Sequence, residues 1–319
     1  MIDPKVIIEA RNLEQYFYLR DGGVLKAVDG VSFSIPEGKT LGLVGESGCG
    51  KSTTGRALVG MYSGTGGDVF FDGQNIASMD ASQSRAFVRH AQMIFQDPYS
   101  SLNPRMTVGD IVGEGIDIHE LYQGRERTDR IYELLSLVGL SKEHANRFPH
   151  EFSGGQRQRI GIARSLAVEP RFIVCDEPIS ALDISIQSQV VNLLSHLQQQ
   201  FNLSYLFISH DLSMVKYISD HVAVMYLGKI VEMAPSELLY ASPTHPYTQA
   251  LLSAIPIADP NAERSRRREL LTGDVPSPIN PPKGCCFAPR CPRASKGCLD
   301  EAVPLREVTR GHFVACKDL

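Results

Sequence analysis

The stretch of this sequence with the clearest chemical potential is GESGCGKST, at residues 45–53. It fits the pattern G-x-x-x-x-G-K-[ST], follows the apolar run TLGLV and precedes a segment expected to be helical. Glycines let successive backbone N–H groups ring a phosphate, Lys51 can reach the β and γ oxygens, and Ser52 can ligate Mg²⁺. The residues predicted to bind phosphate are Gly45, Ser47, Gly48, Cys49, Gly50, Lys51, Ser52 and Thr53. The alternative, a plain glycine-rich turn, is disfavoured by the flanking strand and helix.

Two adjacent carboxylates follow a second apolar run, in RFIVCDEP at residues 171–178. A buried strand here delivers Asp176 and Glu177 to the carboxyl edge of a sheet, where open α/β sheets bind ligands. We expect Asp176 to hold Mg²⁺ through water, and Glu177 to orient and polarise a water that attacks phosphate in line. The alternative is an acidic pair on the surface.

These side chains need a scaffold of alternating strands and helices. Strands are predicted in VIIEARNL, VSFSI, TLGLV, RFIVCD, SYLFIS, HVAVMYLG and KIVEMA, and helices over about 51–60 and 185–201. Short, strongly apolar strands separated by helices predict an α/β fold whose mostly parallel sheet is covered on both faces.

Two regions depart from this alternation. In RTDRIYELLSLVGL the apolar residues Ile131, Leu134, Leu135 and Val138 recur at helical spacing before Gly139, a predicted C-cap. Beyond about Pro243 the chain is rich in proline and charge, including RSRRR at 264–268, which we expect to be a solvated face or linker. We predict a core over 1–98 and 153–235, an inserted helical subdomain over 99–152, and a loop-rich C-terminal domain over 236–319.

The composition indicates which partners and which cellular compartment to expect. The chain has 319 residues, of which 43% are apolar and 21% charged, with a net charge of −4. This balance gives no general reason to expect a nucleic-acid partner. The sequence shows no secretory leader and no run of eighteen apolar residues, so we expect a cytosolic chain whose cysteines stay reduced.

Cysteines concentrate at the C-terminal end. Five of the seven lie in the last 35 positions, and Cys285, Cys291, Cys298 and Cys316 are spaced C-x5-C-x6-C-x17-C. That spacing matches neither common zinc sites nor ferredoxin runs. Thiols gathered in a segment too small for a good core nevertheless suggest that a metal organises it.

The order of the motifs resembles that of the ATPase subunits of ABC transporters. EFSGGQRQR at 151–159 is similar to their signature sequence, with Phe152 where many members have leucine. The resemblance implies a P-loop NTPase core and the substrates ATP and Mg²⁺. It also implies that a second helix N-terminus contacts ATP bound by another subunit, through Ser153, Gly154, Gly155 and Gln156.

Further positions match this family one by one. Gln96 in IFQDP resembles the glutamine that touches Mg²⁺ or the attacking water, and His210 in ISHD resembles the histidine that contacts the γ-phosphate. Asp183 in SALD resembles a residue of the dimer interface. The adenine is expected to stack on an aromatic ring of LEQYFY, with Phe17 favoured over Tyr16 and Tyr18.

The segment SPTHPYTQALLSAIP, at 242–256, and the following GDVPSPINPPKGC resemble the C-terminal region of oligopeptide and dipeptide importers, in the F-type partner of their two ATPases. The resemblance implies ATP-driven import at the cytoplasmic face of the membrane, with a D-type ATPase, two membrane permease subunits and an extracellular or periplasmic peptide-binding protein. Nickel and glutathione importers share this region. Two rival classes of protein are a soluble ABC ATPase outside transport and a scaffold that only binds ATP.

The same resemblance implies that Cys285, Cys291, Cys298 and Cys316 hold a [4Fe–4S] cluster, with zinc or free thiols as alternatives. The sequence departs from the importer pattern at Cys286, at Ala288 and at Lys317. Cys285 occupies the matching position, and Cys286 has no assigned role.

Overall fold

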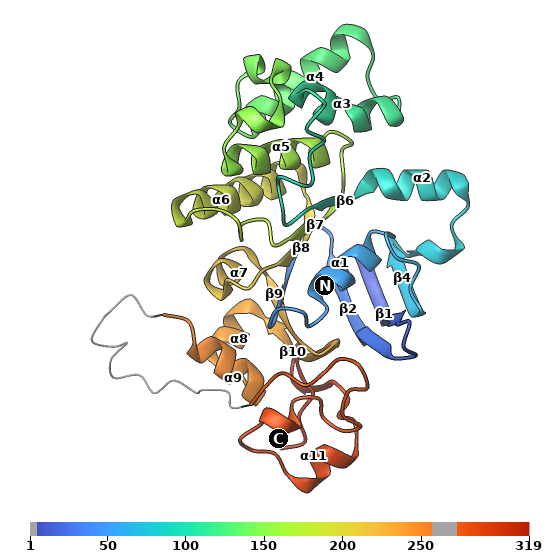
Figure 1. The fold of residues 1–319 in the computed structure, drawn as a ribbon, viewed down its shortest axis with the longest axis vertical. Helices are drawn as coiled ribbons and strands as arrows, with labels where there is room; N and C mark the ends of the chain where they lie inside the picture. Colours follow the sequence, from blue (N-terminus) through green and yellow to red (C-terminus); the bar gives the residue numbers. More distant parts are fainter. Residues whose placement is uncertain (1–4, 257–272, 319) are drawn as a thin grey trace.

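The structure is a computed structural model that describes residues 5–256 and 273–318. The arginine-rich stretch at 264–268 lies outside the described residues. Figure 1 shows three regions along the long axis: a helical region at one end, a sheet-based centre, and the cysteine-containing C-terminal region at the other end.

The centre is built on an eight-stranded sheet with the order β11-β12-β10-β9-β3-β8-β7-β6. Its strands are β3 (Thr40–Val44), β6 (Ala91–Ile94), β7 (Phe172–Asp176), β8 (Ser204–Ile208), β9 (His221–Tyr226), β10 (Lys229–Pro235), β11 (Arg306–Thr309) and β12 (His312–Val314). The pairs β6–β7, β7–β8, β8–β3 and β3–β9 are parallel, and the other three are antiparallel. The predicted parallel α/β core is therefore present, extended on one side by antiparallel strands.

The two N-terminal strands do not belong to the main sheet. β1 (Val6–Tyr18), β2 (Val24–Pro36), β4 (Gly66–Phe71) and β5 (Gln74–Asn75) form a separate four-stranded sheet in the order β2-β1-β4-β5. All its pairs are antiparallel. The sequence predicted the first two strands without this separate sheet, because an apolar run does not reveal its pairing partner.

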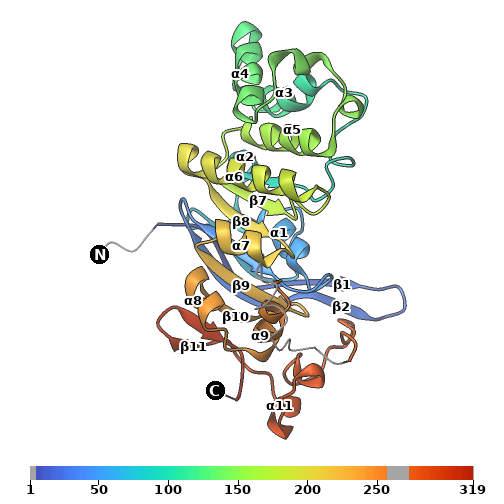
Figure 2. The same cartoon turned by 90° about the vertical axis from the view of Figure 1, so that its left-hand side faces the viewer.

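Helices cover both faces of the main sheet. α1 (Lys51–Leu58) and α2 (Ala81–His90) lie on the side of the antiparallel sheet, and α6 (Ile184–Phe201) and α7 (Leu212–Ile218) lie on the other (Figures 1 and 2). The helical region consists mainly of α3 (Val108–Ile118), α4 (Gly124–Leu137) and α5 (Gly154–Leu166), with short 3₁₀ turns at Lys142–Asn146 and Pro149–Glu151. α4 has the predicted periodicity, and Gly139 follows it with a φ of 76°.

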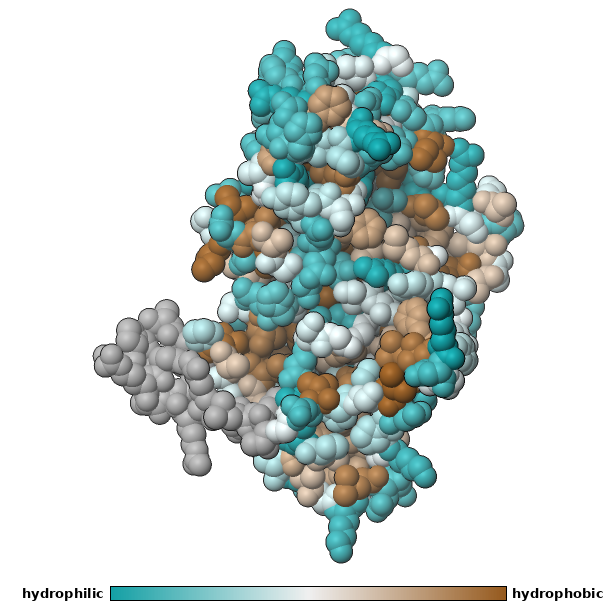
Figure 3. Space-filling model, in the orientation of Figure 1, coloured by the Kyte–Doolittle hydropathy of each residue, from teal (hydrophilic) through white to brown (hydrophobic). Residues whose placement is uncertain are grey.

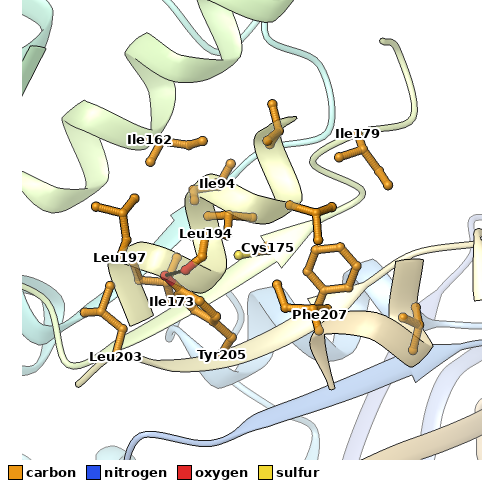
Figure 4. Close-up of a cluster of buried hydrophobic side chains, with 14 of the residues drawn as sticks. Ile94, Ile162, Ile173, Cys175, Ile179, Leu194, Leu197, Leu203, Tyr205 and Phe207 are labelled. Carbon is orange, nitrogen blue, oxygen red and sulfur yellow. Dashed lines mark hydrogen bonds between the residues drawn. The ribbon is translucent and has the colours of Figure 1, made fainter. Parts of the chain in front are cut away.

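Successive side chains of each strand point to opposite faces of the main sheet, and this divides the core into two clusters. In β7, Phe172 and Val174 pack toward the antiparallel sheet and α1, whereas Ile173 and Cys175 pack toward α5 and α6. Figure 4 shows the second cluster, where the Tyr205 hydroxyl donates a hydrogen bond to the Leu194 carbonyl at 3.1 Å. Burial on both faces explains why these strands read as continuous apolar runs.

The C-terminal region joins the main sheet directly. It contains α8 (Ser236–Ala241), α9 (Pro246–Ser253), a 3₁₀ turn (Ala288–Arg290), α11 (Lys296–Asp300), and strands β11 and β12. β12 pairs with β10 through Glu232–Val314 and Met233–Phe313. The region is loop-rich, as predicted, but its two strands were missed, because four-residue and three-residue strands carry too little alternation to detect.

No helix among the described residues is both long and apolar enough to cross a membrane. On the face shown in Figure 3, apolar residues form separate patches among hydrophilic ones.

Candidate functional site

The phosphate loop connects β3 to α1, and its glycines hold conformations that other residues would strain. Gly50 precedes α1 with a φ of 109°, and Gly45 has a φ of 152°. A Cβ on Gly50 would lie 2.0 Å from the Ala27 carbonyl oxygen, and one on Gly45 would lie 2.1 Å from that of Met225. The backbone can therefore follow this path only with glycine at both positions.

Lys51 is the first residue of α1, and its ammonium group folds over the loop. Its Nζ donates hydrogen bonds to the carbonyl oxygens of Gly45 at 2.8 Å and Glu46 at 3.0 Å. The side chain is buried, so the charge is held at the helix N-terminus, where partial positive charge already favours anions. Cys49 is buried beside it, and burial raises the pKa of its thiol, which leaves it neutral.

Asp176, at the end of β7, faces Ser52 across the loop. The Ser52 hydroxyl donates a 2.7 Å hydrogen bond to Asp176 Oδ1. Burial is the main cause of a raised pKa for Asp176, and the bond from Ser52 opposes it. A hydroxyl and a carboxylate in contact are the oxygen donors that suit Mg²⁺, so this pair fits that ion.

Glu177 meets two side chains from neighbouring strands. Gln96, just after β6, donates a hydrogen bond from Nε2 to Glu177 Oε2 at 2.8 Å, and His210 Nδ1, just after β8, lies 3.5 Å from the same oxygen. All three follow the carboxyl ends of parallel strands, so the sheet gathers them at one edge. Glu177 has a φ of 45°, a left-handed backbone uncommon outside glycine.

One cleft of about 460 Å³ collects most of the predicted site. Its lining comprises Phe17, Leu25, Ala27, Ser47, Gly48, Gly50, Lys51, Ser52, Thr53, Gln96, Glu177 and His210. Of the three candidate rings, only Phe17 lines it. Tyr16 donates its hydroxyl to Asp29, and Tyr18 is 75% exposed.

The predicted signature residues lie elsewhere. Ser153 caps α5 and forms a reciprocal capping box with Gln156, and Gly154 and Gly155 begin the helix. Asp183 precedes α6 without a side-chain capping bond and is exposed, as is its neighbour Ile184. None of these residues is among those lining the cleft, so the described chain does not bring its own signature to its own phosphate loop.

The four predicted ligand cysteines share one small enclosed cavity of about 20 Å³. Its lining includes Cys285, Cys291, Cys298 and Cys316. Cys286 points elsewhere, with its buried Sγ 3.8 Å from the Tyr226 carbonyl oxygen. Among the described residues, no three His, Cys, Asp or Glu side chains are arranged to hold a metal ion. The structure thus separates Cys286 from the other four thiols without displaying a formed ligand set.

Family models match both parts of the chain. One described as ABC transporter matches residues 28–180, and one described as the C-terminal region of oligopeptide/dipeptide transporters matches residues 231–298. The chain is 52% identical to the oligopeptide transport ATP-binding protein AppF of Bacillus subtilis (strain 168), over 98% of this chain and 97% of that protein. It belongs to the ABC transporter ATPases. OppF of the same strain is 55% identical, over 98% of this chain and 96% of that protein.

Solved ABC ATPase structures share the fold. A dimeric ATP-binding cassette, MJ0796, bound to ADP and Pi is 26% identical with a TM-score of 0.65, over 72% of this chain and 99% of that one. CbiO1 from Clostridium perfringens, part of the transporter complex cbiONQ, is 25% identical with the same TM-score, over 75% of this chain and 92% of that one. The predicted family, fold and ATPase class are thereby confirmed.

Sequence reasoning missed two side chains that hold the phosphate loop of this ABC ATPase. The Tyr247 hydroxyl accepts a hydrogen bond from the Glu46 backbone N–H at 2.9 Å, and Arg290 forms two hydrogen bonds to the Glu46 carboxylate. Both come from the C-terminal region, more than 200 positions along the chain from Glu46. Both residues lie in segments that resemble the importer C-terminal region, but that resemblance gives neither a role, and no local pattern predicts contacts between partners so distant in sequence.

Proposed function

We propose that this chain is the ATP-hydrolysing subunit that powers import of oligopeptides or dipeptides across the cytoplasmic membrane. The observation that carries the ATPase part is the cleft in which the phosphate loop, Gln96, Glu177 and His210 face one another. The full-length similarity to oligopeptide transport ATP-binding proteins supports peptides as the cargo.

In this proposal the phosphates of ATP lie on the backbone N–H groups of residues 47–51, and Lys51 neutralises the β and γ oxygens. Ser52 and Asp176, with Gln96 nearby, would hold Mg²⁺, which supplies charge neutralisation on the phosphates when bound. Glu177 orients the attacking water and accepts its proton, and Gln96 keeps the carboxylate in place. His210 contacts the γ-phosphate. Hydrolysis then proceeds by positioning and electrostatics, without a covalent intermediate.

Phe17 binds the adenine base of ATP in this proposal. Its ring lines the cleft and packs edge-on against Tyr62, with ring centroids 5.6 Å apart. One face of an aromatic ring held in this way can stack on adenine.

The proposed active unit is a head-to-tail dimer with a related, D-type ATPase. Ser153, Gly154, Gly155 and Gln156 would contact ATP held by that subunit, and Asp183 would lie at the interface. The capped N-terminus of α5 supports this because its N–H groups point outward from a helix start, a favourable position for a phosphate. Two permeases and an extracellular or periplasmic peptide-binding protein complete the importer, which places this chain at the cytoplasmic face. No nucleic acid takes part.

A panel of cargoes tests this function. The complete transporter, reconstituted in vesicles with its binding protein, is offered a labelled oligopeptide, a dipeptide, glutathione or Ni²⁺. We expect ATP-dependent uptake of peptides. Uptake of only nickel or glutathione would contradict the proposed cargo, and ATP turnover without uptake of any cargo would favour an ABC ATPase outside transport.

We further propose that Cys285, Cys291, Cys298 and Cys316 ligate a [4Fe–4S] cluster with a structural role. Support comes from their common cavity and from the separate burial of Cys286. Four thiols that share one cavity are a donor set suited to iron–sulfur or zinc. Anaerobic purification with iron, sulfide and zinc analysis tests the proposal. A folded, colourless, iron-free protein would contradict it.

A further inference from the structure

An ion pair between Arg290 and Glu46 connects the cysteine-containing region to the phosphate loop. Arg290 Nη1 and Nη2 donate to the two carboxylate oxygens of Glu46 at 2.8 and 3.1 Å. Arg290 is almost fully buried, with 7% of its side chain exposed, and Glu46 retains 26%. Two parallel bonds of this kind fix both the position and the orientation of a carboxylate.

Glu46 is held at each of its backbone polar atoms as well. Its N–H donates to the Tyr247 hydroxyl at 2.9 Å, and its carbonyl oxygen accepts from Lys51 Nζ at 3.0 Å. Glu46 is therefore the residue through which Lys51 and the C-terminal region meet.

Arg290 is itself held by its surroundings. It belongs to the 3₁₀ turn Ala288–Arg290, between Cys285 and Cys291, and its Nη1 lies 3.4 Å from the Tyr226 hydroxyl. The ring of Tyr226 packs against Phe287, with centroids 5.3 Å apart. The position of the guanidinium is thus set jointly by the 3₁₀ turn of the cysteine-containing region and by Tyr226 at the end of β9.

The C-terminal region also contacts β2 next to the cleft. Ile279 forms an isolated antiparallel bridge with Leu25, and the Lys26 N–H donates to the Pro278 carbonyl oxygen at 3.4 Å. Leu25 lines the cleft together with Phe17. The region therefore contacts the cleft near both the phosphate loop and the aromatic ring.

We propose that Arg290 is a positioning residue for ATP binding: it neutralises and orients Glu46 so that the phosphate loop can accept a polyphosphate. This inference rests on the proposed ATPase function. Glu46 does not itself line the cleft, but it directly precedes the lining residue Ser47. Without Arg290, its carboxylate would be uncompensated within the phosphate loop, where its charge would weaken the attraction for ATP and attract Lys51. The cysteine-containing region would then control nucleotide affinity through a single side chain.

The test is a double-mutant cycle on KM for ATP and kcat, measured in the reconstituted transporter. Arg290→Met should raise KM about tenfold, because an unpaired negative charge then lies within the phosphate loop, and should change kcat less than about twofold. Glu46→Gln should leave KM within about threefold of wild type, because it removes the negative charge while its amide oxygen can still accept a hydrogen bond from Arg290. In the double variant, Glu46→Gln should relieve most of the increase.

A merely structural role for Arg290 would not give that relief. Arg290→Lys, which retains the charge but cannot form the two parallel bonds, should give a KM between those of the wild type and Arg290→Met. Arg310→Met, in an exposed turn of the same region, is the matched control and should leave both constants unchanged. Arg290→Gln replaces the methionine variant in the cycle if the latter fails to assemble.

An unchanged KM in Arg290→Met, or an increase that Glu46→Gln does not relieve, would overturn the inference. Failure of the wild-type transporter to hydrolyse ATP would instead contradict the proposed function.

Discussion

At the scale of single residues, the site depends on an uncommon backbone conformation at Glu177, whose φ is 45°. A left-handed conformation at a non-glycine residue persists only where its surroundings enforce it. Here the Glu177 N–H donates to the Ile208 carbonyl oxygen at 3.0 Å, and Gln96 holds the carboxylate. The side chain is thereby aimed along the sheet edge toward the phosphate loop. This is the geometry that a group orienting water needs.

The proposed stacking of Phe17 on adenine can be tested by substitution. Phe17→Ala should raise the Kd for ATP about fivefold, because stacking on one ring contributes roughly 1 kcal/mol. Tyr18→Ala is the control, since Tyr18 is exposed and does not line the cleft. Titration of each purified variant with ATP measures the effect. Equal losses in the two variants would argue against Phe17 as the stacking ring.

The sequence could predict those site residues that belong to motifs with fixed spacing. The phosphate loop, Asp176 and Glu177 carry their chemistry in consecutive residues, next to a strand that places them. Arg290 and Tyr247 carry no such signal. Their contacts with Glu46 arise from tertiary packing, so they become visible only in the folded structure.

At the scale of elements, a buried carboxylate holds the C-terminal region to the main sheet. Glu232 in β10 accepts hydrogen bonds from the backbone N–H groups of Thr244 and His245, at 2.8 and 2.9 Å, and lies 2.7 Å from His312 Nε2 in β12. Glu232 has no exposed surface. It therefore links β10, the start of α9 and β12.

Removing that carboxylate should loosen the C-terminal region. Glu232→Ala should destabilise the protein by about 3–5 kcal/mol, because it leaves the buried partners unsatisfied. Glu237→Ala, an exposed glutamate in α8, is the control and should cost less than about 1 kcal/mol. Thermal unfolding and limited proteolysis measure the difference. Equal stability of the two variants would contradict this role for Glu232.

The same elements show how far periodicity predicts a fold. Helix α4 and strands β7 and β8 were found because apolar residues repeat at helical spacing or run without a break. The antiparallel N-terminal sheet and the strand pair β11–β12 were missed, because pairing depends on partners remote in sequence. The C-terminal region consequently looked more separate from the ATPase core than it is.

At the scale of the whole molecule, the phosphate loop and the signature residues lie in different places. The phosphate loop lines the cleft, whereas Ser153 at the start of α5 does not. ABC ATPases dimerise, and a head-to-tail arrangement would bring each signature to the other subunit's ATP. Binding and turnover should therefore respond differently to substitutions in the two motifs.

This separation can be tested with two variants. Lys51→Ala should abolish ATP binding by the isolated chain, whereas Ser153→Ala should leave it unchanged, because Ser153 lies outside the cleft. In the assembled transporter both should slow turnover, Ser153→Ala by roughly tenfold or more, since one donor to the transition state is lost. Weakened ATP binding by the isolated Ser153→Ala chain would show that the signature serves its own site.

The central claim is that peptide import is driven by ATP hydrolysis at the cleft containing Glu177. The most direct measurement is the rate of phosphate release by the reconstituted transporter, with and without its binding protein and a peptide. We predict that peptide raises the wild-type rate, and that Glu177→Gln still binds ATP but loses about 10²–10⁴-fold in turnover and stops uptake. Phosphate release and uptake by the Glu177→Gln transporter at the wild-type rate would contradict the account.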